Sequence, residues 1–130
     1  MPLLIDTDVA IRLRDGSAAI AARISEAGAP SISAVTLAEL EAGVAHDQSS
    51  DKVRRRLLDA LLDFVPVLPF TPAEAAAYGR IVRTTGYDRR RVLDRMIAAQ
   101  AITAGLPLAT INGRDFRDIP DLDLLDWSVE

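Results

Sequence analysis

Four acidic side chains stand at places in this 130-residue sequence from which they could meet at one site. Asp6 directly follows the apolar residues 3–5, and Glu39 lies within a predicted helix. Asp94 lies in a helix before a later predicted strand, and Asp115 follows that strand. Converging carboxylates are the hard oxygen ligands that Mg²⁺ or Mn²⁺ prefers, and such ions can assist the hydrolysis of phosphodiester bonds. The pattern therefore predicts a divalent metal site suited to that chemistry.

Each acid also has a local explanation that needs no metal. Asp6 could simply cap the N-terminus of the following helix. Glu39 follows Thr36 by three residues, which is the spacing of a capping box. Asp94 lies among arginines and could form a surface ion pair, and Asp115 could favour the N-terminus of a short helix. One shared site nevertheless explains all four acids more simply than four coincidences do.

Strands alternate with helices along the chain, which is typical of a mostly parallel sheet with helices on both faces. Strands are predicted at residues 3–5, 31–33, 65–69, 106–110 and 124–127, and helices at 9–14, 17–28, 34–46, 50–63, 72–85 and 91–104. Pro66 and Pro69 lack the amide proton that a central strand needs, so the third strand is expected at an edge. The carboxyl ends of the first and fourth strands can be neighbours, which would bring Asp6 and Asp115 together.

The composition is that of one globular domain spanning residues 1–130, with 49% hydrophobic and 26% charged residues. The sequence has no cysteine, which excludes disulfides and thiolate metal sites. No stretch approaches the roughly 18 apolar residues of a membrane span, so we expect a cytoplasmic protein without membrane attachment. The net charge of −4 argues against binding to nucleic acid through bulk positive charge.

Four sequence blocks resemble those of PIN-domain ribonucleases, and in particular those of the VapC toxins of bacterial toxin–antitoxin pairs. The blocks are residues 4–9 (LIDTDV), 33–40 (SAVTLAEL), 94–99 (DRMIAA) and 108–116 (LATINGRDF). They occur in the order and at the spacings of that family, and the last block is the most specific. The resemblance covers essentially the whole chain. It implies a single α/β PIN-like domain with a parallel sheet of about five strands in the order 3-2-1-4-5, flanked by helices.

The resemblance also implies a Mg²⁺- or Mn²⁺-dependent endoribonuclease that cleaves RNA. Its catalytic and metal-binding residues would be the four acids already identified, Asp6, Glu39, Asp94 and Asp115. Thr110 and Asn112 match polar positions that would orient Asp115 or a phosphate of the substrate, with helix capping as their alternative role. Asp8 stands where the family often has asparagine or serine. We therefore expect it at most to contact the residues that bind the metal, without binding the metal itself.

Partners follow from the same resemblance: an RNA substrate, a homodimer, and a cognate antitoxin protein bound in a heteromeric complex. The amphipathic stripe along residues 53–62, together with the alanine-rich helix at 72–85, is expected to form a groove for an antitoxin segment. Core packing is the alternative explanation for this stripe. RNA is expected to contact some members of a basic rim made of arginines, namely Arg80, Arg83, Arg89, Arg90 and Arg91.

Two other classes of protein share the opening Asp6-Thr7-Asp8. A haloacid-dehalogenase-like phosphatase also needs a lysine near the phosphate, and the only lysine is Lys52, in a helix of surface type. A non-catalytic phospho-receiver-type signalling domain needs an Asp at the end of the third strand, where residues 68–70 are Leu-Pro-Phe. Both departures favour the ribonuclease interpretation.

Overall fold

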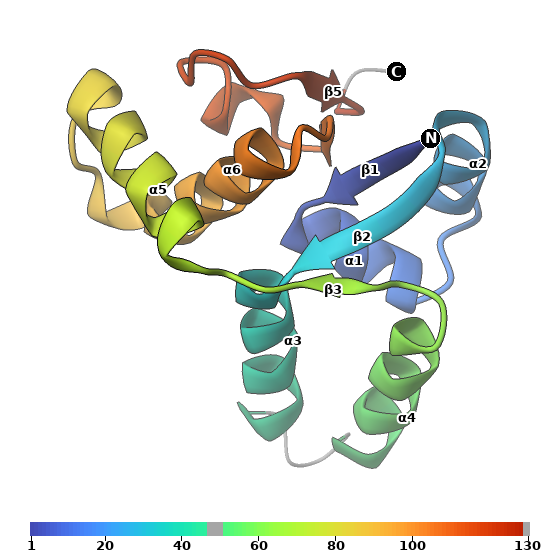
Figure 1. Ribbon diagram of the computed structural model, residues 1–130. Helices are drawn as coiled ribbons and strands as arrows, with labels where there is room; N and C mark the ends of the chain where they lie inside the picture. The colour runs from blue at the N-terminus through green and yellow to red at the C-terminus, as the bar shows by residue number, and fades with distance from the viewer. Residues whose placement is uncertain (47–50, 129–130) are drawn as a thin grey trace.

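The fold is built on a parallel sheet with the strand order β3-β2-β1-β4-β5, as expected from the sequence (Figure 1). A computed structural model describes residues 1–46 and 51–128 of the chain. Its elements are β1 (Pro2–Ile5), α1 (Thr7–Arg14), α2 (Ala18–Ala27), β2 (Ala29–Ser33), α3 (Ala34–His46), α4 (Asp51–Leu62), β3 (Val67–Leu68), α5 (Pro72–Thr85), η1 (Arg89–Arg91), α6 (Val92–Ala104), β4 (Leu108–Thr110), η2 (Gly113–Asp115) and β5 (Leu124–Asp126).

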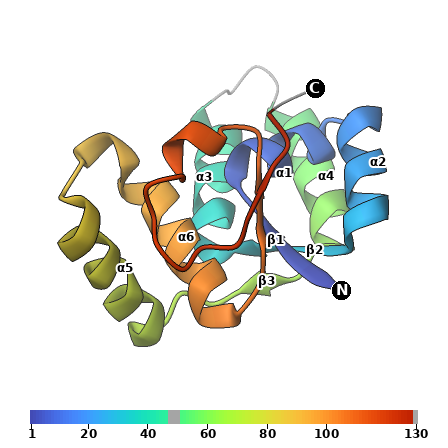
Figure 2. The ribbon, with the colours of Figure 1, turned by 90° about the horizontal axis from the view of Figure 1, so that it is seen from above.

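The central strand β1 is buried on both of its faces. Leu3 and Ile5 belong to a core shared with α1, α2 and α4, whereas Leu4 belongs to a second core shared with α5 and α6. This division follows from the alternation of side chains along a strand. Figure 2 shows α5 and α6 on one side of the sheet and α1, α2 and α4 on the other. A continuous apolar run is therefore what this position in the sheet requires.

The third strand lies at an edge, as its two prolines predicted. β3 pairs only with β2 in the described part of the chain, and it is shorter than the predicted strand at 65–69. Pro66 contributes its carbonyl oxygen, which accepts a hydrogen bond from the amide of Ile32 at 3.0 Å. A proline can accept such a bond but cannot donate one, so the edge position accommodates it.

Most helix ends lie where local signals predicted them. Ser17 caps α2, and Gly28 follows its last residue. Thr71 caps α5, which begins at Pro72. The helix predicted at 91–104 begins one residue later because η1 (Arg89–Arg91) precedes it. The first residue of the helix predicted at 50–63 lies outside the described residues.

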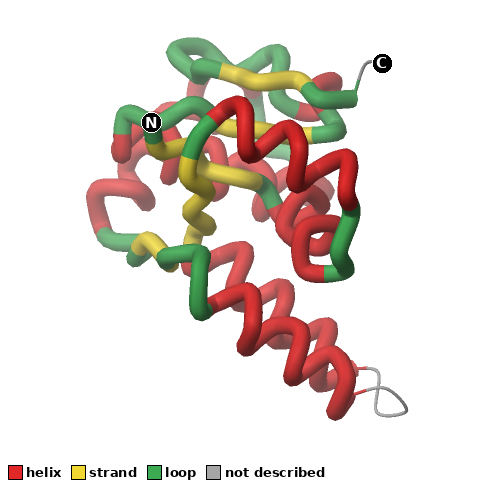
Figure 3. The backbone as a smooth tube through the Cα atoms, turned by 90° about the vertical axis from the view of Figure 1, so that its right-hand side faces the viewer, coloured by secondary structure: helices red, strands yellow, loops and turns green. Residues whose placement is uncertain are grey.

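The helices α3 and α4 lie side by side and extend away from the sheet (Figures 1 and 3). The predicted groove between α4 and α5 is wrong, because α4 packs with α1 and α3 while α5 packs with α6 against the opposite face of the sheet. The helical stripe alone could not reveal which face each helix covers. The described helices are all too short or too polar to cross a lipid bilayer.

Candidate active site

The four predicted acids come from elements that meet where β1 and β4 end as neighbours. Asp6 follows β1, Glu39 lies on α3, Asp94 lies in the first turn of α6, and Asp115 ends η2. The charges of Asp115 and Glu39 raise the pKa of Asp94, and the charge of Asp94 raises the pKa of Asp6. The fold therefore brings Asp94 within range of charge repulsion from each of the other three acids.

Asp6 is the most deeply buried of the four acids, with 3% of its surface exposed. Its Oδ1 accepts a hydrogen bond from the amide of Val9 at 3.0 Å, and its Oδ2 accepts one from the hydroxyl of Thr110 at 2.6 Å. Burial raises the pKa of Asp6 to about 6, although both hydrogen bonds lower it. Asp6 thus caps α1 and also lies within the group of acids, so the two interpretations of this residue are compatible.

Asp94 is half-buried and makes no ion pair with any described residue, which removes the surface ion-pair explanation. Burial raises the pKa of Asp94 to about 6, and the charges of Asp115, Glu39 and Asp8 add to this effect. The nearby positive charge of Arg91 acts in the opposite direction. The charges of its acidic neighbours therefore change the pKa of Asp94 more than the charges of the arginines beside it in sequence do.

Glu39 is held by a hydroxyl group rather than by a capping box. Thr7 Oγ1 donates to Glu39 Oε1 at 2.6 Å and lies 3.1 Å from Thr36 Oγ1. Thr36 is a buried residue inside α3, so the capping-box explanation of Glu39 is wrong. Sequence reasoning did not identify Thr7 as a site residue, although its place next to Asp6 was a signal that could have done so.

Two polar residues at and just after the end of β4, Thr110 and Asn112, bond residues at the start of α1 that are far away in sequence. Asn112 Nδ2 donates a hydrogen bond to Asp8 Oδ2 at 2.5 Å. Thr110 Oγ1 accepts a hydrogen bond from the backbone amide of Asn112 at 2.9 Å and donates its own to Asp6. Asn112 makes no side-chain capping bond to η2, so capping does not explain it. These bonds fix the backbone turn that leads to Asp115.

A second residue missed in the sequence is the buried Arg95. It is 3% exposed, donates to the carbonyl of Gly86 at 2.9 Å and to Asp118 Oδ2 at 3.0 Å, and also bonds the hydroxyl of Thr85. Arg95 thereby ties the loop after α5 to α6. Its place directly after Asp94 in the sequence gave no indication that it is buried.

Among the arginines of the predicted rim, Arg91 lies next to the acids. Its Nη2 is 3.7 Å from Asp115 Oδ1, and its Nε is 3.6 Å from Asp88 Oδ2. Arg90 is almost fully exposed, and Arg80 lines a separate hollow together with Asp121. Contact of this rim with RNA stays a prediction.

A divalent ion suits the donor chemistry of the acids, although they are not assembled to hold one. Within residues 1–46 and 51–128, no three acidic or histidine side chains converge closely enough to hold a metal ion as they stand. Hydroxyl groups of Thr110 and Thr7 engage Asp6 and Glu39 instead. The potential ligands are nevertheless hard carboxylate oxygens whose mutual repulsion a cation would relieve. Metal binding would therefore require side-chain rotations that bring them closer.

Comparisons with known proteins agree on one family. The PIN domain family model matches residues 3–122. Ribonuclease VapC1 of Rickettsia felis is 35% identical to this chain over 98% of each. The tRNA(fMet)-specific endonuclease VapC of Shigella flexneri is 29% identical and covers 98% of this chain and 99% of its own length. The structure of VapBC-1 from nontypeable Haemophilus influenzae has a TM-score of 0.82 at 27% identity and covers 99% of this chain and 100% of its own.

Proposed function

Because the chain belongs to the PIN-domain family and, within it, to the VapC ribonucleases, we propose that it is the toxin of a toxin–antitoxin pair and cuts RNA internally at its acidic site. The observation that carries the location of this site is the raised pKa of Asp94, which burial raises most and to which the charges of Asp115, Glu39 and Asp8 add. Like charges held close together oppose folding. Carboxyl groups whose pKa values are raised in this way occur preferentially at functional sites.

The proposal includes Mg²⁺ or Mn²⁺ as the cofactor. The residues that would hold it are the four acids, Asp6, Glu39, Asp94 and Asp115. When bound, the ion supplies positive charge beside the phosphate and a water of lowered pKa. Protons compete with a cation for the same carboxylates, and the pKa values of Asp6 and Asp94 are about 6. We therefore expect cation binding to weaken as the pH falls below about 6.

The surrounding polar residues orient two of the four carboxylates, those of Asp6 and Glu39. Thr110 and the amide of Val9 orient Asp6, and Thr7 orients Glu39. Hydrogen bonds to a charged group are among the stronger ones in proteins, so each of these contacts restrains its acid. The positive charge of Arg91 lowers the pKa of Asp94 and so favours its ionised form. A carboxylate must be in this form to bind a cation or to accept a proton from water.

Cleavage of RNA by the purified protein tests the proposal. We expect cleavage in Mg²⁺ or Mn²⁺, none in EDTA, and a loss of at least ~10² in rate for Asp94→Asn, which keeps the side-chain shape and removes one charge. The matched control is Glu26→Gln, an exposed acid on α2, which should cleave like wild type. Full cleavage in EDTA, or by Asp94→Asn, would contradict the proposal.

The proposed protein partner is a cognate antitoxin, which forms a heteromeric complex with the toxin. A hollow of about 450 Å³ lies between α1, α2 and the end of α4. Apolar side chains line it, among them Leu13, Ile24, Leu61 and Phe64, and Phe64 is 81% exposed. An amphipathic peptide helix binds such a groove through its apolar face. This surface replaces the α4–α5 groove that the sequence predicted.

The remaining expectations belong to the same proposal. A homodimer and contact of RNA with the arginine rim stay predictions, and a ribonuclease toxin is expected to act in the cytoplasm, where its substrate is. The phosphatase alternative has no support, since Lys52 lies exposed on α4. The phospho-receiver alternative has none either, because β3 ends at Leu68 and continues into Pro69.

A further inference from the structure

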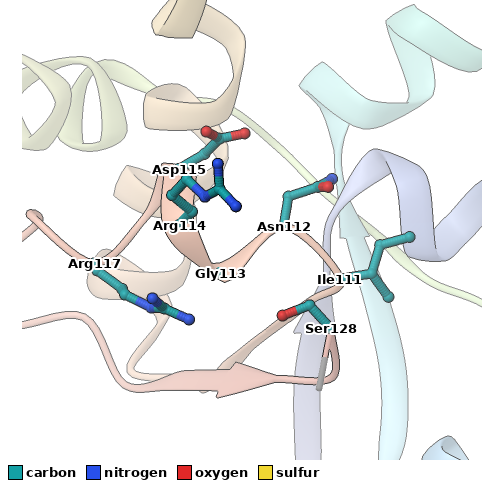
Figure 4. A pocket seen from close by; sticks show the side chains of 7 residues that line it. All are labelled: Ile111, Asn112, Gly113, Arg114, Asp115, Arg117 and Ser128. Atoms are coloured by element: carbon teal, nitrogen blue, oxygen red, sulfur yellow. The ribbon is translucent and has the colours of Figure 1, made fainter. Parts of the chain in front are cut away.

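A hollow of about 310 Å³ opens directly beside the acidic site, over the turn that follows β4. Asn112, Gly113 and Asp115 form one wall of it, so it shares residues with the site described above. Figure 4 shows Arg114 next to Asp115 on one side of Gly113, with Arg117 and Ser128 on the other side. Two guanidinium groups and a hydroxyl group thus line a space that borders the proposed catalytic acids.

The carboxylate of Asp126, at the end of β5, packs against Gly113, which is one of the residues that line this hollow. A Cβ atom at Gly113 would lie 2.0 Å from Asp126 Oδ2, so only glycine leaves room for this carboxylate. Asp126 accepts hydrogen bonds from Arg117 Nη2 at 2.8 Å and from the amide of Ser128 at 3.0 Å. The positive charge of Arg117 is therefore largely balanced by Asp126, and its side chain is held in place.

Arg114 differs from the other arginines near the acids because its charge is not balanced. It is exposed, and within the described residues it makes no hydrogen bond or ion pair. Arg91, in contrast, lies between Asp88 and Asp115, and Arg117 is paired with Asp126. A guanidinium group without a paired carboxylate, placed beside the acids, can attract an anion and can bond two of its oxygens.

We propose that this hollow binds a backbone phosphate of the RNA strand next to the phosphodiester bond that is cut, with Arg114 as its main ligand. The proposal rests on the proposed ribonuclease function and names how the substrate is held there. A protein of net charge −4 with several carboxylates at the proposed site repels a polyanion, so it needs a local cation close to the acids. The planar fork of arginine suits two oxygens of one phosphate. The hydroxyl of Ser128 already donates its hydrogen bond to Asp126, so the phosphate depends on Arg114 for its donors.

Four proteins are compared in the main test: wild type, Arg114→Gln, the conservative variant Arg114→Lys and the matched control Arg56→Gln. Arg56 is an exposed arginine on α4, which lies far from β5 in Figure 1. RNA affinity is measured in EDTA over a range of salt concentrations, and kcat and KM are measured in Mg²⁺ or Mn²⁺. For Arg114→Gln we expect affinity to fall about 5- to 10-fold and the salt slope to become shallower by about 0.7, the value for one phosphate of a single strand. KM should rise by a similar factor with kcat nearly unchanged. Arg56→Gln should match wild type, and Arg114→Lys should recover the slope.

A second measurement locates the phosphate. Single linkages of an RNA oligonucleotide that wild type cleaves at one bond are replaced, one at a time, by an uncharged methylphosphonate. At one linkage near the cut, wild type should lose affinity while Arg114→Gln should lose little more, because the variant already lacks the interaction. Equal losses for both proteins at every linkage would overturn the proposal.

The outcomes separate this inference from the function on which it rests. If wild type cleaves RNA and Arg114→Gln has the same KM and salt slope, the phosphate site is wrong and the ribonuclease function stands. A fall in kcat without a rise in KM would also overturn it, because Arg114 would then act in the chemical step. If wild type neither binds nor cleaves RNA, both proposals fail. Equal melting temperatures of the four proteins would exclude unfolding as the cause of any difference.

Discussion

Replacing Asp94 by Asn is expected to stabilise the metal-free protein at neutral pH, although the same change should slow cleavage in Mg²⁺ or Mn²⁺ by at least ~10²-fold. The pKa of Asp94 is raised from 3.8 to about 6 by burial and by Asp115, Glu39 and Asp8. At about 1.4 kcal/mol for each factor of ten in proton affinity, this difference corresponds to about 3 kcal/mol of unfavourable free energy for the ionised form. Because Asp94 is only half-buried, solvent screens part of this cost, and we expect a gain of about 1–2 kcal/mol for the variant.

The gain must depend on pH in a definite direction. Between about pH 4 and pH 6, folded wild type keeps a proton on Asp94 that the unfolded chain has already lost. Wild-type stability therefore falls as the pH rises through this range. Asparagine has no proton to lose, so the advantage of Asp94→Asn should grow from nearly zero at about pH 4 to its full size above about pH 6.

Thermal unfolding in EDTA at about pH 4.5 and pH 7.5 measures this difference, and a gain of 1–2 kcal/mol should raise the melting temperature by about 3–8 °C. Glu26→Gln is the control and should change stability by less than about 0.5 kcal/mol at either pH. Mg²⁺ should raise the melting temperature of wild type more than that of Asp94→Asn, because a cation binds the native acids. The reasoning would be refuted if Asp94→Asn melted at a lower temperature than wild type at pH 7.5. It would also be refuted if the difference in melting temperature between the two proteins were the same at both pH values.

Three further predictions test the neighbours of the site. Thr110→Val removes the hydroxyl that bonds Asp6, so it should lower the free energy of unfolding by about 1.5–3 kcal/mol at pH 7 and by less at pH 4. The same change should raise the pKa of Asp6 and so move the acid limb of the pH–cleavage profile to higher pH. The control Thr110→Ser keeps the hydroxyl and should stay close to wild type. Gly113→Ala should cost about 1–3 kcal/mol in chemical denaturation because its Cβ displaces the carboxylate of Asp126, and the cost should shrink in an Asp126→Ala background. Phe64→Ser should leave cleavage unchanged but weaken binding of the cognate antitoxin about 30-fold, because Phe64 is the exposed apolar side chain at the hollow. Calorimetry measures this affinity, and an unchanged value would mean that the antitoxin binds elsewhere.

Local signals in the sequence were sufficient for most of the elements. Ser17 and Gly28 bound α2, and Thr71 with Pro72 begins α5, because capping depends on groups only a few residues apart. Pro66 placed β3 at an edge for an equally local reason, the absence of an amide proton. The order of the strands came from the resemblance to a family rather than from these signals.

Contacts between distant residues were decided only by the tertiary structure. The bonds from Thr110 to Asp6 and from Asn112 to Asp8 each join residues 104 positions apart, and they exist because β4 lies next to β1. The same is true of the carboxylate of Asp126 over Gly113, which needs β5 beside β4. Where local spacing competed with such contacts it misled, as for Glu39, which bonds Thr7 of another helix.

The sequence by itself thus determined which residue types could bind a cation and where helices and strands begin. It could not determine which face of the sheet a helix covers, because an amphipathic stripe shows that one side is buried but not against what; α4 and α5 differ in this respect. Nor could it determine that the charge of Arg114 is unbalanced while that of Arg117 is neutralised, since this depends on where Asp126 lies in the folded chain. Side chains far apart in sequence meet only when the sheet assembles, and electrostatic balance at the site is a property of that assembly.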